Sequence, residues 1–142
     1  MHIAVIDGQG GGIGRLLVEK IRLELGDRIK VLALGTNATA TAAMLKAGAN
    51  EGATGENAVV FSCSRVDVIV GSVAILAANS FHGELTPRMA EAIAASPAGK
   101  VLLPLNRSQI EIIGVLDEPL PVQAERVASR LHYQLEHEGA DH

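Results

Sequence analysis

Apolar positions in the amino-terminal half of the chain alternate between short continuous runs and longer segments with helical spacing. Continuous runs of Val, Ile, Leu and Ala are typical of strands that are buried on both faces of a parallel sheet. Apolar residues spaced three and four apart predict an amphipathic helix, and a glycine after such a segment predicts its end. The pattern predicts strands at residues 3–7 and 29–34 and helices at residues 12–25 and 38–47, ended by Gly26 and Gly48.

Two β-like runs in the middle of the chain, residues 58–63 and 66–70, are separated by only two residues. A parallel connection needs a crossover of about a dozen residues, so either these runs form a hairpin or one of them is not a strand. We favour the second alternative, with Thr54 as the N-cap of a helix at residues 56–63. The same interpretation predicts a short third strand near residues 52–53 and a fourth strand at residues 66–71.

Prolines mark the helix starts in the carboxyl-terminal half. Thr86 followed by Pro87 fits an N-cap with proline in the first helical position, and this helix is expected to run to about Ser96. Pro119 and Pro121 introduce a last helix, whose apolar face is expected to comprise Ala124, Val127, Ala128, Leu131 and Leu135. The remaining expectations are an apolar loop or short helix at residues 72–83, strands at 100–105 and 110–115, and a frayed tail at 138–142 after a single domain at 1–137.

The first predicted strand runs directly into a glycine-rich turn. Gly8, Gly12 and Gly14 fit the variant fingerprint G-x-x-x-G-x-G, whereas Ile13 stands where the commoner G-x-G-x-x-G needs its third glycine. Such glycines let the backbone approach a pyrophosphate, with N–H groups of the helix aimed at it; the alternative is a merely tight turn. Together with the alternation of strands and helices, the motif predicts an α/β fold, a Rossmann-like, doubly wound, mostly parallel sheet in three α/β/α layers.

Residues 7–14, Asp-Gly-Gln-Gly-Gly-Gly-Ile-Gly, resemble the opening of short-chain dehydrogenases, with Asp7 where that family usually has threonine. The resemblance implies a cofactor-binding half and a catalytic Tyr-x-x-x-Lys. Tyr133, the only tyrosine, is followed four residues later by His137 instead of lysine, so the catalysis of that family is not carried over. A second resemblance extends along the chain: four segments are similar to a small uncharacterised bacterial family with a Rossmann-like fold, which implies no chemistry, at residues 3–14, 32–38, 44–58 and 83–87.

Composition and charge exclude several classes of partner. The 142 residues carry 12 Lys and Arg against 16 Asp and Glu, a net charge of −4, and the basic residues are scattered, so neither a nucleic-acid footprint nor an anionic membrane surface is indicated. The single cysteine excludes an intrachain disulfide and a cysteine-based zinc cage, and no metal site is indicated. The apolar amino-terminal run is too short for a signal peptide or a membrane span, so we expect a cytoplasmic protein.

Ligands of an open parallel sheet bind beyond the carboxyl ends of the strands, near the point where the strand order reverses. We expect the residues at these ends to form one site for a small phosphorylated ligand or dinucleotide, with NAD or NADP as the leading cofactor. The expected site comprises Gly8, Gln9, Gly10, Gly11, Gly12, Ile13, Gly14, Gly35, Thr36, Asn37, Gly71, Ser72 and Asn106.

The end of the second strand lacks the Asp or Glu that would bind the ribose diol of NAD. Thr36 and Asn37 can instead hydrogen-bond a ribose hydroxyl or a 2′-phosphate, which favours NADP or another phosphorylated ligand. The alternative is that Asn37 only caps the following helix.

Catalytic candidates are few. His82 and Glu84, in the loop above the sheet, form a pair that can perform acid–base chemistry; the alternative is a capped loop with solvated polar groups. Cys63 is expected to be a small buried hydrophobe. Three functions stay open: an NAD(P)-dependent oxidoreductase that completes its site as a homo-oligomer, a non-enzymatic sensor or regulatory subunit, and a protein whose glycines only shape a turn.

Overall fold

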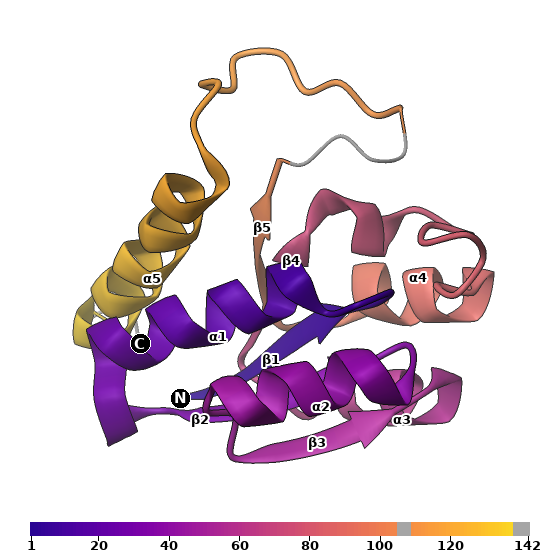
Figure 1. Cartoon of the computed structure of the whole chain (residues 1–142), viewed down its shortest axis with the longest axis horizontal. Helices are drawn as coiled ribbons and strands as arrows, with labels where there is room; N and C mark the ends of the chain where they lie inside the picture. Colours follow the sequence, from indigo (N-terminus) through magenta and orange to yellow (C-terminus); the bar gives the residue numbers. More distant parts are fainter. Residues whose placement is uncertain (105–108, 138–142) are drawn as a thin grey trace.

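The computed structural model describes residues 1–104 and 109–137 (Figure 1). Strands and helices alternate along the chain, as expected for an α/β protein. The elements are β1 (His2–Asp7), α1 (Gly12–Leu25), η1 (Gly26–Arg28), β2 (Lys30–Gly35), α2 (Ala38–Ala47), β3 (Glu51–Thr54), α3 (Glu56–Ser62), β4 (Val68–Ser72), η2 (Val73–Leu76), α4 (Pro87–Ala95), β5 (Gly99–Leu103) and α5 (Leu120–His137).

Within the described ranges, five parallel strands form one sheet in the order β3-β2-β1-β4-β5. The central strand β1 pairs Val5 with Ala33 of β2 on one side and with Val70 of β4 on the other. Since the chain moves outward from β1 through β2 to β3 and then returns to β4, the strand order reverses between β1 and β4. This reversal is the switch point at which ligands of such sheets bind.

Helices cover both faces of the sheet. Helices α1, α2 and α5 pack on one face, and α3, η2 and α4 pack on the other, which gives the predicted three layers (Figure 1). Successive β1 side chains serve opposite faces: Ile3 and Val5 belong to the first cluster, Ala4 and Ile6 to the second. The predicted doubly wound α/β fold is confirmed.

The capping residues explain most helix boundaries. The Thr86 hydroxyl accepts the N–H of Met89 at 3.2 Å, with Pro87 in the first helical position of α4, as expected. Helix α1 ends at Gly26, whose φ is 55°. The prediction of Thr54 as the N-cap of α3 is wrong, because β3 continues through this residue and Gly55 takes the cap position instead.

The predicted strand at residues 110–115 is absent. This segment belongs to an irregular arm, residues 109–119, that leaves the sheet before α5 (Figure 1). Gln109 and Gly114 have left-handed φ values of 55° and 88°, so extended backbone is interrupted at both ends of the apolar run. Among the described residues, β5 therefore lies at one edge of the sheet, opposite β3 at the other edge.

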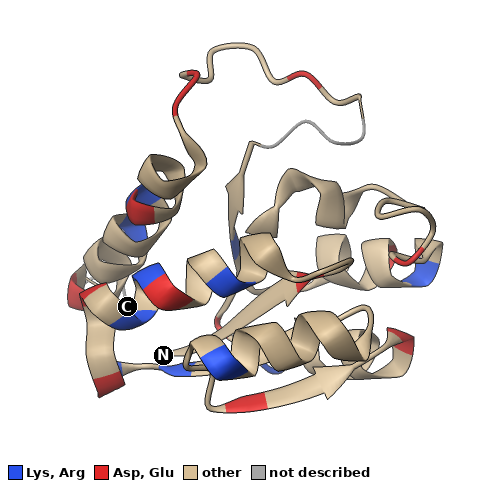
Figure 2. Cartoon of the chain, viewed as in Figure 1, with Lys and Arg blue, Asp and Glu red and all other residues tan. Residues whose placement is uncertain are grey.

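Charged side chains of both signs are interspersed along α1 and α5 (Figure 2). Some of them form ion pairs: Lys20 of α1 pairs with Glu125 of α5 at 3.2 Å, and Arg126 of α5 pairs at 2.8 Å with Glu118, which precedes the helix. None of the helices in the part of the chain described is long and apolar enough to cross a membrane.

Candidate functional site

The β1–α1 turn lies at the switch point and is organised by Asp7, the last residue of β1. This buried carboxylate accepts the N–H of Gly8 at 2.8 Å through Oδ1 and the N–H of Gly14 at 2.6 Å through Oδ2. The end of the strand is thereby tied to the first turn of α1. Two backbone donors of the turn are satisfied inside the protein.

Three glycines of the turn are buried, and the fold itself requires each of them. A Cβ on Gly8 would lie 2.6 Å from Thr36 Oγ1, and one on Gly14 would lie 2.6 Å from Met44 Sδ. Gly11 has a left-handed φ of 76° and would meet the backbone of Ala40 at 2.8 Å. Packing and backbone geometry therefore account for these three positions without a ligand.

The other two glycines, Gly10 and Gly12, are exposed and have no such requirement. Neither has a left-handed φ, and a Cβ on either would meet no heavy atom within 4 Å. Among the described residues, the backbone N–H groups of Gly10, Gly12 and Ile13 have no hydrogen-bond acceptor. Helix α1 therefore begins with free donors beside open space, which is the arrangement that binds phosphate at helix N-termini.

A hollow of about 320 Å³ lies over this turn. Besides the turn itself, it is bordered by Phe81 from the loop before α4 and by Leu120, the first residue of α5. Arg15 also borders the hollow, and its guanidinium pairs with Glu19 at 2.7 Å on the surface of α1. The full lining is Asp7, Gly8, Gln9, Gly10, Gly11, Gly12, Ile13, Arg15, Leu16, Phe81 and Leu120.

A second carboxylate, that of Glu84, reaches the turn from the loop between η2 and α4. Its Oε1 accepts hydrogen bonds from Thr36 Oγ1 at 2.6 Å, from the N–H of Gln9 at 2.8 Å and from Asn37 Nδ2 at 2.9 Å. The hydrogen bond from Thr36 is the largest of the causes that lower the pKa of Glu84 below its usual value, followed by that from the Gln9 backbone, while partial burial opposes them. Glu84 is therefore an anion at neutral pH.

The residues expected at the end of β2 are brought together. The Oδ1 of Asn37 accepts the N–H of Ala40 at 2.9 Å, so Asn37 caps α2, as the alternative interpretation predicted. Its Nδ2 donates to Glu84 and also to the carbonyl of Gln9 at 2.9 Å. Gly35 is the last residue of β2, and a Cβ there would collide with Thr41.

Two other expected site residues, Gly71 and Ser72, are not part of the lining of the hollow. Gly71 packs under η2, where a Cβ would lie 2.9 Å from the carbonyl oxygen of Ile6. The buried Ser72 hydroxyl accepts the N–H of Ala74 at 3.3 Å and so begins η2. Asn106 lies outside the described residues.

The structure does not join His82 and Glu84 by a hydrogen bond. His82 is exposed and contributes only a weak electrostatic lowering of the pKa of Glu84. The lowered pKa makes Glu84 a poor base at neutral pH. The acid–base role of His82 and Glu84 stays a prediction. Cys63 is buried, and burial raises its pKa to about 11, as expected for a structural thiol.

Sequence reasoning did not anticipate Phe81 and Leu120 as parts of the lining, nor Glu84 at the end of β2. Glu84 and Thr36 are 48 positions apart, and no periodicity connects two loops across a sheet. Asp7 had a local signal, because a carboxylate directly before a glycine turn is placed to accept its N–H groups.

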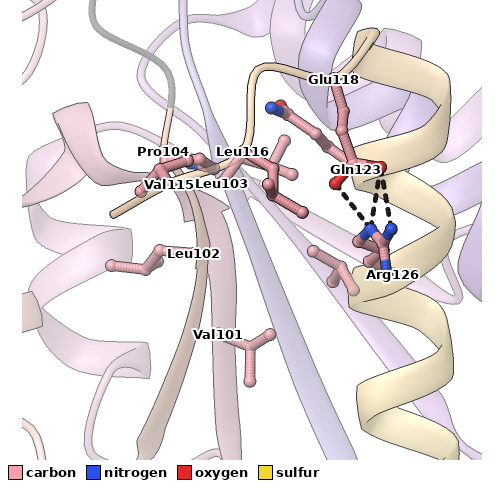
Figure 3. Close-up of a pocket in the computed structure, with 10 residues that line it drawn as sticks. Val101, Leu102, Leu103, Pro104, Val115, Leu116, Glu118, Gln123 and Arg126 are labelled. Atoms are coloured by element: carbon pink, nitrogen blue, oxygen red, sulfur yellow. Dashed lines mark hydrogen bonds and ion pairs between the residues drawn. The ribbon is translucent and has the colours of Figure 1, made fainter. Parts of the chain in front are cut away.

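A second hollow, of about 330 Å³, lies between β5, the arm at residues 109–119 and α5 (Figure 3). Apolar side chains such as Leu103 and Leu116 form most of its wall, and Glu118 pairs with Arg126 at its rim. Its lining includes Gln123, which is about one turn along α5 from Leu120 of the first hollow. Both hollows therefore flank the start of α5.

The parallel sheet, its reversal between β1 and β4 and the glycine turn at that point define a Rossmann-like α/β protein. The chain belongs to the family described as a domain of unknown function, DUF3842, which matches residues 2–136. Comparison with curated proteins and with solved structures finds no match.

Proposed function

We propose that this protein binds a nucleotide or dinucleotide by its phosphates at the β1–α1 turn, with NAD(P) as the leading ligand. The observation that carries the proposal is the pair Gly10 and Gly12. The fold needs no glycine at either position, and both border a hollow beside free N–H groups. Neither packing nor a left-handed φ explains glycine at these two positions. We infer that glycine is present there because a ligand approaches the backbone closely.

The hollow suits the phosphate part of such a ligand. Gly10, Gly12 and Ile13 supply backbone donors in the first turn of α1, where the helix dipole adds to their attraction for an anion. Asp7, the acidic group of the lining, already accepts two N–H groups of the turn. A dinucleotide that is anchored here can extend past Leu120 toward the apolar second hollow, which offers room for its other half.

The proposal is for binding and includes no reaction. The two charged side chains of the lining, Asp7 and Arg15, are engaged with the turn and with Glu19. A loop from beyond β4 is also fastened to the turn through Glu84. A ligand at the turn therefore adjoins a segment whose position it can alter, which favours a sensor as the second candidate over a purely structural protein.

Titration of NADH, followed by its own fluorescence and anisotropy, tests the proposal, since the chain has no Trp to interfere. We expect micromolar binding to the wild-type chain, and at least tenfold weaker binding to Gly12→Val, because the side chain would fill the space that phosphate needs, at about 1.4 kcal/mol or more. Gly99→Val, at an exposed glycine at the start of β5, is the control and should bind as the wild type does. Equal affinity of the Gly12 variant and the wild type would refute the site.

A further inference from the structure

The carboxylate of Glu84 occupies the end of β2, although the residue belongs to the loop that follows β4. It connects three parts of the switch point: the glycine turn through Gln9, the end of β2 through Thr36 and the start of α2 through Asn37. All three hydrogen bonds end on Oε1. Among the described residues, Oε2 has no hydrogen-bond partner, so one acceptor of this fixed carboxylate stays available.

An acidic side chain at the end of β2 is what sheets of this kind use to accept hydrogen bonds from the ribose hydroxyls of a dinucleotide. Here β2 itself ends without an acid, at Gly35, Thr36 and Asn37. The loop before α4 supplies the missing carboxylate across the sheet. Building on the proposed function, we propose that Glu84 determines ligand specificity by accepting a hydrogen bond from an unsubstituted ribose 2′-hydroxyl, so that NAD and not NADP is bound.

The surrounding charges support an unsubstituted ribose. A 2′-phosphate would bring about two negative charges against the Glu84 carboxylate, and like charges in contact disfavour binding. Sites that accept the 2′-phosphate place an arginine nearby. Residues 35–45, from the end of β2 into α2, contain neither Lys nor Arg. Thr36 and Asn37 already donate to Glu84, so a phosphate would gain these donors only by displacing the carboxylate.

The loop that carries Glu84 is held closely against the turn. Asn79, Phe81 and His82 have left-handed φ values of 68°, 61° and 56°, a conformation that side chains disfavour and that surrounding contacts must maintain. A Cβ on Gly8 would lie 2.7 Å from Phe81 and 3.0 Å from Glu84 Oε1. Glu84 is therefore positioned before a ligand arrives, which reduces the ordering that binding requires.

Parallel titrations of NADH and NADPH with the full chain test this inference. We expect the wild type to bind NADH about tenfold or more tightly than NADPH, because of the repulsion of the 2′-phosphate. Glu84→Gln should weaken NADH binding several-fold and bring the two affinities close together. Glu91→Gln, which removes an exposed carboxylate from α4, should keep the wild-type ratio.

The outcomes separate this inference from the proposed function. Equal binding of NADH and NADPH by the wild type, or an unchanged ratio in Glu84→Gln, would overturn the role of Glu84 and leave the phosphate site standing. No binding of either cofactor would overturn both. The wild-type comparison needs no variant, so equal binding of the two cofactors would overturn the role of Glu84 even if Glu84→Gln fails to fold.

Discussion

Asp7 Oδ2 accepts the backbone N–H of Gly14 at 2.6 Å, across seven positions of the chain. This contact joins the end of the central strand to the third residue of α1. Because the carboxylate also accepts the N–H of Gly8, the path of the turn between these residues is fixed before any ligand binds. The positions of the free N–H groups of Gly10 and Gly12 depend on this path of the backbone.

Asp7→Asn should destabilise the protein. The amide keeps one oxygen and cannot accept both N–H groups equally well, so one buried charge-assisted hydrogen bond is lost, at about 1–3 kcal/mol. Urea unfolding followed by circular dichroism at pH 7 measures the difference. Asp27→Asn, at an exposed position in η1, is the matched control and should change the free energy of unfolding by less than about 0.5 kcal/mol. Equal stability of the two variants would contradict the role of Asp7.

Two Gly→Ala changes in the same turn should differ in their effect on stability. The methyl group in Gly14→Ala would meet Met44 Sδ at 2.6 Å and Asp7 Cβ at 2.9 Å, so α1 must shift from the sheet, at about 1–3 kcal/mol. Gly12→Ala meets open space in the first turn of a helix and should be neutral, or stabilising by up to about 1 kcal/mol. The midpoint of urea unfolding separates them, and a comparable loss in both would show that Gly12 too is required by the fold.

The contribution of Glu84 to stability should depend on pH. Its pKa is lower in the folded protein than the ordinary value of 4.5, first of all because of the hydrogen bond from Thr36. The folded state therefore binds fewer protons than the unfolded chain in this range, so the contribution is present above pH 4.5 and is lost as pH falls through the lowered pKa. Urea midpoints of the wild type and Glu84→Gln should differ most at neutral pH and converge as pH falls through the lowered pKa. A constant difference across that range would contradict the ionised carboxylate.

Local sequence signals were sufficient to predict most of the helices and strands. The glycines after α1 and α2 and the Thr86-Pro87 pair gave boundaries that the structure confirms, because capping depends on a few adjacent residues. The crossover argument correctly identified residues 56–62 as a helix despite their β-branched side chains. The predicted strand at residues 110–115 was wrong because strand formation is not a local property. Strand-forming residues make a strand only where a neighbouring strand pairs with them.

The site was only partly predictable from the sequence, because much of it depends on contacts between residues that are distant along the chain. The glycine turn is a local motif, but the motif does not distinguish Gly8, Gly11 and Gly14, which packing requires, from Gly10 and Gly12, which face open space. That division depends on contacts with residues from β2, α2 and the loop before α4. The position of Glu84 depends on the folded loop in the same way.

Cys63 should be unreactive in the folded protein. It is 1% exposed, and burial raises its pKa to about 11, so hardly any reactive thiolate forms at pH 8. We expect Ellman's reagent to modify the thiol slowly in buffer and rapidly in denaturing urea. Prompt modification without urea would contradict its buried position at the C-cap of α3.

The most direct test of phosphate binding at the turn is a titration of the ¹⁵N-labelled chain with NADH, observed through its backbone amide resonances. A hydrogen bond to a phosphate oxygen changes the shift of the donating amide, so Gly10, Gly12 and Ile13 should move most and saturate together, while the amide of Gly99 stays in place. Saturating shifts at these three amides would support the account. Shifts confined to another part of the chain, or none at millimolar NADH, would contradict it.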